Sequence, residues 1–201
     1  MPKSSKSWGR VSVVGTHALY AYETAAGVRI VPGALATQDV DLLWDARKRV
    51  QFVVDLGRDS GSMLTLLRRV DSSFRRKSEE GQNESAVNDK GFEVDFLRRE
   101  AGGGDPHPFR FSADEEDLWP VRAQRASVLT QSPVFVHPVI SATGKLAAMR
   151  TVDPQTFVEF KRWMAEHAQN REPTKRRRDL YQAEIVQALL TEGLLSTRTH
   201  G

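Results

Sequence analysis

Two aspartates with one residue between them are the side chains of this 201-residue chain best suited to chemistry. Asp39 and Asp41 lie in the segment 37–43, TQDVDLL, whose polar–apolar alternation predicts a β-strand with both carboxylates on one face. Two carboxylates held this close repel each other, and their oxygens suit a hard divalent cation such as Mg²⁺ or Mn²⁺. An isolated Asp-x-Asp pair is also typical of an exposed strand edge or turn, so the metal-binding interpretation needs further residues.

A third carboxylate follows on a later predicted strand. The segment 92–97, FEVDFL, alternates so that Asp95 shares a face with Glu93 and Leu97, while the aromatic and aliphatic residues between them form the other face. A lone aspartate on a strand usually just faces solvent. A two-metal phosphoryl-transfer site, however, needs a carboxylate beyond the first pair, and an adjacent strand is a suitable source.

A third feature, Gly15-Thr16, comes directly before a predicted helix. Backbone N–H groups, a hydroxyl and the positive end of a helix dipole would together favour a phosphate group at this position. The alternative is an ordinary helix cap.

The elements that must position these residues follow from periodicity and from turn residues. The pattern predicts an α/β (α+β) fold, in which strands and helices come first and two C-terminal helices follow. We expect a core over residues 1–132 and a helical part packed on it over 133–201. The predicted strands are 37–43, 51–54 and 92–97, with a strand or helix entry at 11–14 and an extended piece from Val134. The predicted helices are 17–26, ending at Gly27, 62–70, Pro154 to His167, capped by Asp153, and about 175 to 194. A loop around Pro32, a polar loop at 75–90 and turns at 102–106 and Gly144 connect them.

These motifs, in this order, resemble the nucleotidyltransferase fold of DNA polymerase beta. That fold has Gly-Ser or Gly-Gly before a helix, an acidic-x-acidic strand and a third acidic residue on a later strand. The resemblance implies a mixed sheet flanked by helices. The sequence is most similar to a bacterial family of nucleotidyltransferase-fold proteins, and more distantly to the toxins of abortive-infection (type IV) toxin–antitoxin systems. The resemblance covers residues 11 to 190, with Thr16 standing where the superfamily most often has Ser or Gly; the hydroxyl is retained.

The resemblance implies a metal-dependent enzyme that transfers a nucleoside monophosphate from a nucleoside triphosphate to an acceptor hydroxyl. Asp39, Asp41 and Asp95 would be the catalytic and metal-binding residues, with Mg²⁺ or Mn²⁺ as cofactor. Gly15 and Thr16 would contact the β- or γ-phosphate of the nucleotide, ATP being one candidate.

The related families also carry a lysine in a later helix, followed by a Lys/Arg-Asp motif. Lys161, Lys175 and Arg178 fit that description and are candidate ligands of the triphosphate tail. On a helix Lys175 and Arg178 share a polar stripe with Asp179 and Gln182. The alternative is that this stripe is a solvated, salt-bridged face.

Composition limits the remaining function classes. The chain has no cysteine, which excludes disulfides, thiolate zinc sites and cysteine nucleophiles. Because no run of about 18 apolar residues and no signal-peptide pattern are present, we expect a cytoplasmic protein without a membrane partner. The net charge is only +3, but basic residues cluster at 68–69, 75–77, 98–99 and 175–178. Such clusters slightly favour an RNA acceptor, for example tRNA, over a protein or small molecule.

Two alternatives belong to other functional classes. The chain could be a catalytically inactive nucleotide- or RNA-binding module on the same fold. It could also be an α/β interaction domain in which the acidic residues coincide by chance; carboxylates more than about 8 Å apart would support that interpretation, because paired catalytic ions lie about 4 Å apart. The resemblance to toxins adds an antitoxin as a candidate partner.

Overall fold

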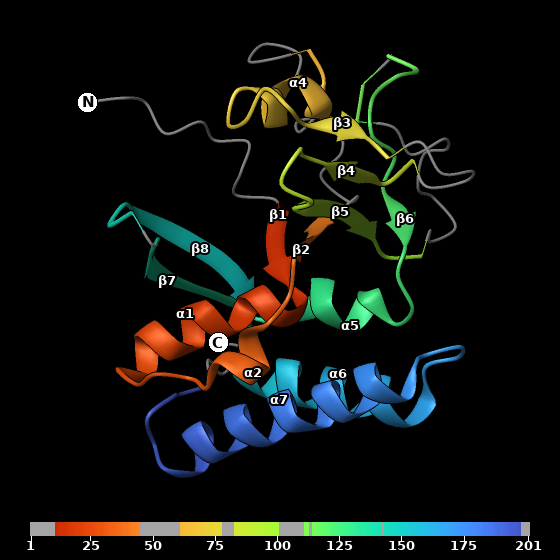
Figure 1. Cartoon of the computed structure of the whole chain (residues 1–201). Coiled ribbons are helices and arrows are strands. Elements are labelled where there is room, and N and C mark those ends of the chain that lie inside the picture. The colour runs from red at the N-terminus through yellow and green to blue at the C-terminus, as the bar shows by residue number, and fades with distance from the viewer. Residues whose placement is uncertain are drawn as a thin grey trace. The chain divides into compact units, whose positions relative to one another are not determined.

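The computed structural model describes residues 11–44, 61–77, 83–100, 111–112, 114–141 and 143–197. The chain forms two compact units: residues 1–12 and 38–126 make the first, and residues 13–37 and 127–201 make the second. Figure 1 labels the elements of both units. The predicted class, a mixed α+β fold with a mixed sheet and a helical C-terminal part, is confirmed. The predicted division at residue 132 into a catalytic and a helical part stays a prediction.

A mixed sheet organises the first unit. Its strands run in the order β1-β2-β5-β4-β3, and β6 pairs with β5 off this path. The β2–β5 and β5–β6 pairs are parallel, whereas β4 is antiparallel to both β5 and β3. The strands are β1 Val11–Val14, whose last two residues belong to the second unit, β2 Asp39–Trp44, β3 Arg75–Arg76, β4 Ser85–Val87, β5 Glu93–Arg98 and β6 Val121–Arg122.

The apolar face of this sheet carries the core of the first unit. Val94 and Phe96, which alternate with the acidic residues of β5, are almost fully buried. The Phe111 ring packs edge-on against both Trp44 and Phe96, with centroids 5.2 and 5.1 Å away. Helix α4, Met63–Arg68, adds Met63, Leu64 and Leu67 to the same cluster. The alternation expected for the two strands is therefore confirmed: one face is apolar and packed, and the other carries the carboxylates.

The start of α4 is fixed by two side chains. Ser62 is the N-cap, and its hydroxyl accepts from the Thr65 N–H at 3.1 Å. The buried Asp117 carboxylate accepts from the N–H groups of Met63 and Leu64 at 3.1 and 2.9 Å. These bonds satisfy N–H groups that have no partner within the helix.

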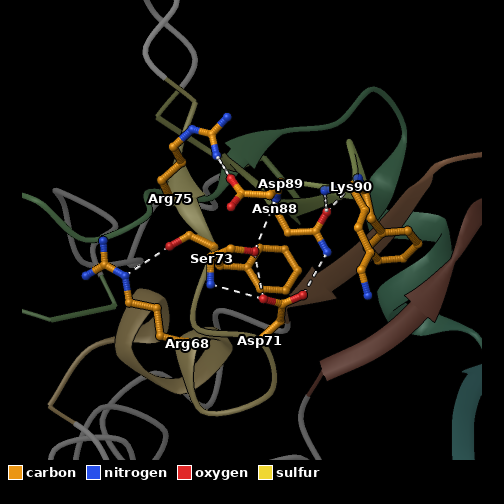
Figure 2. Close-up of polar contacts among 9 residues, drawn as sticks. Arg68, Asp71, Ser73, Arg75, Asn88, Asp89 and Lys90 are labelled. Carbon is orange, nitrogen blue, oxygen red and sulfur yellow. Dashed lines mark hydrogen bonds and ion pairs between the residues drawn. The ribbon is translucent and has the colours of Figure 1, made fainter.

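The segment 75–90 was predicted to be a loop, and that prediction is wrong for its described ends. β3 and β4 pair here, and a turn at Asn88–Gly91 leads into β5. The Asn88 side chain holds the turn, because its oxygen accepts from the N–H groups of Lys90 and Phe92 at 3.0 and 2.9 Å. Figure 2 shows how Asn88 also reaches Asp71, whose carboxylate accepts from Ser73 and Asn88. These short elements lack a hydrophobic period long enough to recognise in the sequence.

Helix α1 and a two-stranded sheet form one part of the second unit. The 3₁₀ turn Gly15–His17 leads into α1, Ala18–Ala26, which ends at Gly27 in the left-handed conformation (φ 66°), as predicted. Tyr22 of α1 is fully buried and donates its hydroxyl to the Val152 carbonyl at 2.8 Å. The sheet consists of β7 Val134–Ile140 and β8 Leu146–Val152; the sequence predicted the first strand and the turn at Gly144 but not the second strand.

Helices α6 and α7 form the C-terminal part of this unit. α6, Pro154–His167, starts as predicted: Asp153 caps it by accepting from the Gln155 N–H at 3.0 Å. α7 runs from Pro173 to Thr191. Along α7, Leu189 is buried and Ala188 is exposed. The remaining helices of the described chain are α2 Pro32–Leu35, where a loop was predicted, and α5 Ala126–Gln131.

Two predicted elements, the strand at 51–54 and the turn at 102–106, lie outside the described residues. None of the helices in the described ranges combines the length and the apolarity needed to span a bilayer.

Candidate active site

The three predicted carboxylates come together on the polar face of the first unit's sheet. β2 and β5 pair in parallel, with Asp41 opposite Asp95 and Asp39 opposite Glu93. Because residues opposite each other in paired strands project to the same face, the alternation that buries Val94 and Phe96 leaves the acidic residues on the other side. One carboxylate oxygen from each of Asp39, Asp41 and Asp95 lies within 4.8 Å of the other two.

This spacing fits a divalent cation. In octahedral Mg²⁺ coordination, with metal–oxygen distances of about 2.1 Å, two ligand oxygens are at most about 4.2 Å apart. Oxygens that lie within 4.8 Å of one another are close to this spacing, so the three carboxylates could hold such an ion after small side-chain rotations. The donors are all hard carboxylate oxygens, which suit Mg²⁺ or Mn²⁺. The observed separation is also well below the limit of about 8 Å that would have favoured a chance coincidence.

Asp95 has a distinct electrostatic environment among the three. Partial burial raises the pKa of its carboxyl group, and the negative charges of Glu93, Asp39 and Glu84 raise it further, while a hydrogen bond from Ser85 opposes the shift. The Ser85 hydroxyl donates to Asp95 Oδ1 at 2.6 Å. Burial and neighbouring negative charges disfavour the ionised form of this carboxyl group. A cation beside it would favour the ionised form, so this carboxylate suits a metal ligand.

Glu93, opposite Asp39, does not add a fourth open carboxylate. The Lys77 ammonium group lies 3.1 Å from Glu93 Oε1, so the pair is neutral overall. Lys77, which directly follows β3, thus neutralises the charge of Glu93. The negative charge of the acidic cluster is concentrated on Asp39, Asp41 and Asp95.

The predicted phosphate-binding residues belong to the second unit. Gly15 has φ 66°, a left-handed conformation that favours glycine and that turns the chain from β1 into the helix. Thr16 is buried, and its hydroxyl oxygen accepts a hydrogen bond from Gln182 of α7 at 3.1 Å. The structure therefore brings the third motif of the sequence into contact with the C-terminal helix.

The three predicted cations have different surroundings. Lys175 is exposed and makes no ion pair among the described residues. Arg178 is half-buried and donates to the Ala36 carbonyl at 3.2 Å. Lys161 is only 5% exposed, and its ammonium group lies 2.8 Å from the fully buried carboxylate of Asp179. Their assignment to the triphosphate stays a prediction, and only Lys175 is openly accessible.

The polar stripe of α7 is not a solvated face along its whole length. Asp179 and Gln182 are 0% exposed, and both are bound by other side chains of the second unit. The alternative of a fully solvated, salt-bridged face therefore holds only for the exposed Lys175 end of the stripe.

A family model described as nucleotidyltransferase matches residues 4–200, which is nearly the whole chain. The chain belongs to this nucleotidyltransferase family. Searches of curated proteins and of solved structures gave no significant match. The resemblance inferred from the acidic residues and from Gly15-Thr16 is confirmed at the level of the nucleotidyltransferase family, and the chain is a nucleotidyltransferase.

Two residues of the nucleotidyltransferase's candidate site were missed by sequence reasoning. Ser85 lies in the segment predicted to be a loop, because its strand, β4, has only three residues and shows no hydrophobic period of recognisable length. Gln182 was seen only as a member of a polar stripe. Nothing in its local sequence indicates a partner 166 residues away.

Proposed function

We propose that this nucleotidyltransferase moves a nucleoside monophosphate from a nucleoside triphosphate to an acceptor hydroxyl, and that the reaction depends on Mg²⁺ or Mn²⁺. The observation that carries the proposal is the carboxylate cluster: three acidic side chains on two adjacent parallel strands, with ligand oxygens within 4.8 Å. The match of nearly the whole chain to a nucleotidyltransferase family supports the reaction class.

Asp39, Asp41 and Asp95 would hold the metal. When bound, a divalent ion in this cluster supplies positive charge that neutralises the triphosphate and lowers the pKa of a coordinated hydroxyl. Asp95 is the residue suited to accept the proton of the acceptor hydroxyl, because its own pKa is raised by burial and by neighbouring negative charge. The acceptor oxygen then forms a bond to the α-phosphorus, the bond from the α-phosphorus to the bridging oxygen breaks, and pyrophosphate leaves.

The triphosphate tail would be bound by Gly15 and Thr16, with Lys175 as the accessible cation and Arg178 and Lys161 as the further candidates. The left-handed Gly15 and the helix that follows it offer backbone N–H groups. Preorganised donors of this kind favour the charge that develops on the leaving pyrophosphate.

Incubation with each α-labelled nucleoside triphosphate tests the proposal. The reaction would contain Mg²⁺ or Mn²⁺ together with total cellular RNA and protein, and wild type would run beside Asp39→Ala/Asp41→Ala. We expect label on an acceptor with wild type only, and the labelled species then identifies RNA, protein or a small molecule. Asp89→Ala is the matched control, because Asp89 is an exposed aspartate that pairs with Arg75 in the same unit.

Nucleotide binding without transfer under any of these conditions would contradict the proposal and would favour the inactive nucleotide- or RNA-binding module. Absence of nucleotide binding would contradict the site itself.

The basic clusters support RNA, such as tRNA, as the first acceptor class to test. In the cluster at 75–77, however, each residue has an acidic partner, Asp89, Glu116 or Glu93, so it contributes little net charge.

The toxin hypothesis predicts that expression of wild type arrests growth. Asp39→Ala/Asp41→Ala should not do so. Equal growth of the two strains would contradict a toxic activity and would remove the reason to search for an antitoxin partner.

A further inference from the structure

Gln182 of α7 is a fully buried polar side chain in contact with the predicted phosphate-binding motif. It is 0% exposed, and its amide nitrogen donates to two acceptors: Thr16 Oγ1 at 3.1 Å and the Ala34 carbonyl at 2.7 Å. A buried amide without partners would cost about 1–3 kcal/mol, so these bonds determine where the side chain lies.

The Ala34 carbonyl determines which way the amide points. A carbonyl oxygen only accepts hydrogen bonds, so the Gln182 nitrogen, and not its oxygen, must face Ala34. The second N–H of the same nitrogen is directed at Thr16. The Thr16 hydroxyl oxygen is therefore an acceptor in this contact, and its own proton must point elsewhere. Among the described residues, no acceptor receives that proton.

A second contact from the same helix supports the arrangement. Arg178 lies one turn before Gln182 and donates to the Ala36 carbonyl at 3.2 Å. Residues four apart share one face of a helix, so α7 holds the carbonyls of Ala34 and Ala36 from one face. The segment that carries the Ala34 acceptor is thus also bound by α7 at a second carbonyl, that of Ala36.

We propose that Gln182 is a positioning residue for nucleotide binding: it holds the Thr16 oxygen and directs the Thr16 hydroxyl proton toward a terminal phosphate oxygen of the nucleoside triphosphate. The inference rests on the proposed function, in which Thr16 contacts the β- or γ-phosphate. Gln182 itself does not touch the nucleotide. Its contribution is preorganisation, since a hydroxyl that is already oriented loses little entropy when the phosphate arrives.

A double-mutant cycle tests the inference. The four proteins are wild type, Thr16→Val, Gln182→Met and the double variant, and the measurements are the Kd for Mg²⁺-tripolyphosphate by calorimetry and kcat and KM for the nucleotide used in transfer. A hydrogen bond to a charged group corresponds to about tenfold or more in affinity. Each single variant should weaken binding by about this factor, and the double variant should be no weaker than Thr16→Val.

The loss should appear in KM and Kd with kcat nearly unchanged, because the contact exists before the reaction as well as during it. Thr16→Ser keeps the hydroxyl and should recover most of the affinity that Thr16→Val loses. Gln187→Met is the matched control, because it makes the same replacement on α7 at a half-buried position that does not contact Thr16. If Gln182→Met does not fold, Gln182→Asn provides the same cycle with a shorter amide.

Three outcomes separate the inference from the function beneath it. If Thr16→Val weakens binding and Gln182→Met does not, the positioning role of Gln182 is overturned and the Thr16 contact stands. If the two losses add in the double variant, Gln182 acts independently of Thr16, which also overturns it. If neither variant changes the Kd, the Thr16–phosphate contact of the proposed function fails as well.

Discussion

At the residue scale, the candidate site consists of like charges that the fold forces together. Asp41 and Asp95 are opposite each other in a parallel strand pair, and Asp39 is close enough to raise the pKa of Asp95. Partial burial raises the pKa of Asp95 most, and the hydrogen bond from Ser85 offsets only part of the total shift. Such an arrangement should cost stability in the free protein, and the proposed cation would relieve that cost.

This cost predicts that Asp95→Asn melts at a higher temperature than wild type in EDTA at pH 7. The pKa of Asp95 is raised in the folded state, so ionisation of this carboxyl group destabilises the fold as the pH rises above its unfolded-state value. The difference should therefore widen between about pH 4 and pH 7. About 1 kcal/mol corresponds to roughly 2–4 °C for a chain of this size.

Differential scanning fluorimetry over this pH range measures the effect, and Asp89→Asn is the control at an exposed position. A lower melting temperature for Asp95→Asn would mean that the carboxylate is stabilising, contrary to the account.

Sequence reasoning predicted the three aspartates because each lies in a strand with a clear period of two. It could not predict Ser85 or Gln182 as partners. Ser85 reaches Asp95 only through the pairing of β4 with β5, and Gln182 reaches Thr16 only because α7 and the first helix belong to one unit. Both contacts depend on tertiary structure that local patterns do not encode.

At the element scale, α6 and α7 are joined by a buried charge cluster. Lys161 of α6 and Arg171 of the connecting turn both bind Asp179 of α7, at 2.8 and 2.5 Å. The two capped helices could be predicted from Asp153-Pro154 and from Pro173. The ion pair between them could not be predicted, because nothing in the sequence around Lys161 and Asp179 distinguishes them from exposed charged residues.

Asp179→Ala should therefore lower the free energy of unfolding by about 3–5 kcal/mol, because it leaves the Lys161 ammonium group buried without its partner. Lys161→Met/Asp179→Leu removes both charges and should recover most of this loss. Urea denaturation of the two variants beside wild type measures the difference. A cost for Asp179→Ala below about 1 kcal/mol, typical of surface substitutions, would contradict the buried ion pair.

The turn that connects β4 to β5 gives a prediction about acid stability. In Figure 2 the Asp71 carboxylate lies between Ser73 and Asn88. Hydrogen bonds from the Ser73 hydroxyl and N–H hold the pKa of Asp71 below its usual value. A group whose folded-state pKa is lowered stabilises the fold above its unfolded-state pKa and loses this effect as the pH falls through the folded-state value.

Asp71→Ala should consequently lower the melting temperature at pH 7. The difference from wild type should shrink as the pH falls from about 5 toward 3. Thermal melts across this range provide the measurement, with Asp89→Ala removing the exposed ion pair of the same turn as control. A loss that is equal at both ends of the range would show that the charge of Asp71 is not the cause.

At the scale of the whole molecule, the fold class and the family could be predicted from three short motifs. Long periodic segments such as 154–167 were predicted well. The strands β3, β4 and β8 were not, because a strand depends on the strand it pairs with more than on its own composition.

Metal binding should stabilise the whole chain. At a Mn²⁺ concentration about 100 times the Kd, linkage contributes about 2.7 kcal/mol to the unfolding free energy, which raises Tm by several degrees. Asp39→Ala/Asp41→Ala should show no such rise. An equal rise in both proteins would mean that Mn²⁺ binds elsewhere.

The central claim, that these carboxylates catalyse transfer of a nucleoside monophosphate, is tested most directly by following two labels in one reaction. Each nucleoside triphosphate is supplied with label at the α-phosphate in one tube and at the γ-phosphate in another, with Mg²⁺ and cellular RNA and protein, for wild type and Asp95→Asn. We predict that wild type transfers the α-label to an acceptor and releases the γ-label as pyrophosphate, and that Asp95→Asn does neither. Transfer of the γ-label to an acceptor, or undiminished α-label transfer by Asp95→Asn, would contradict the account.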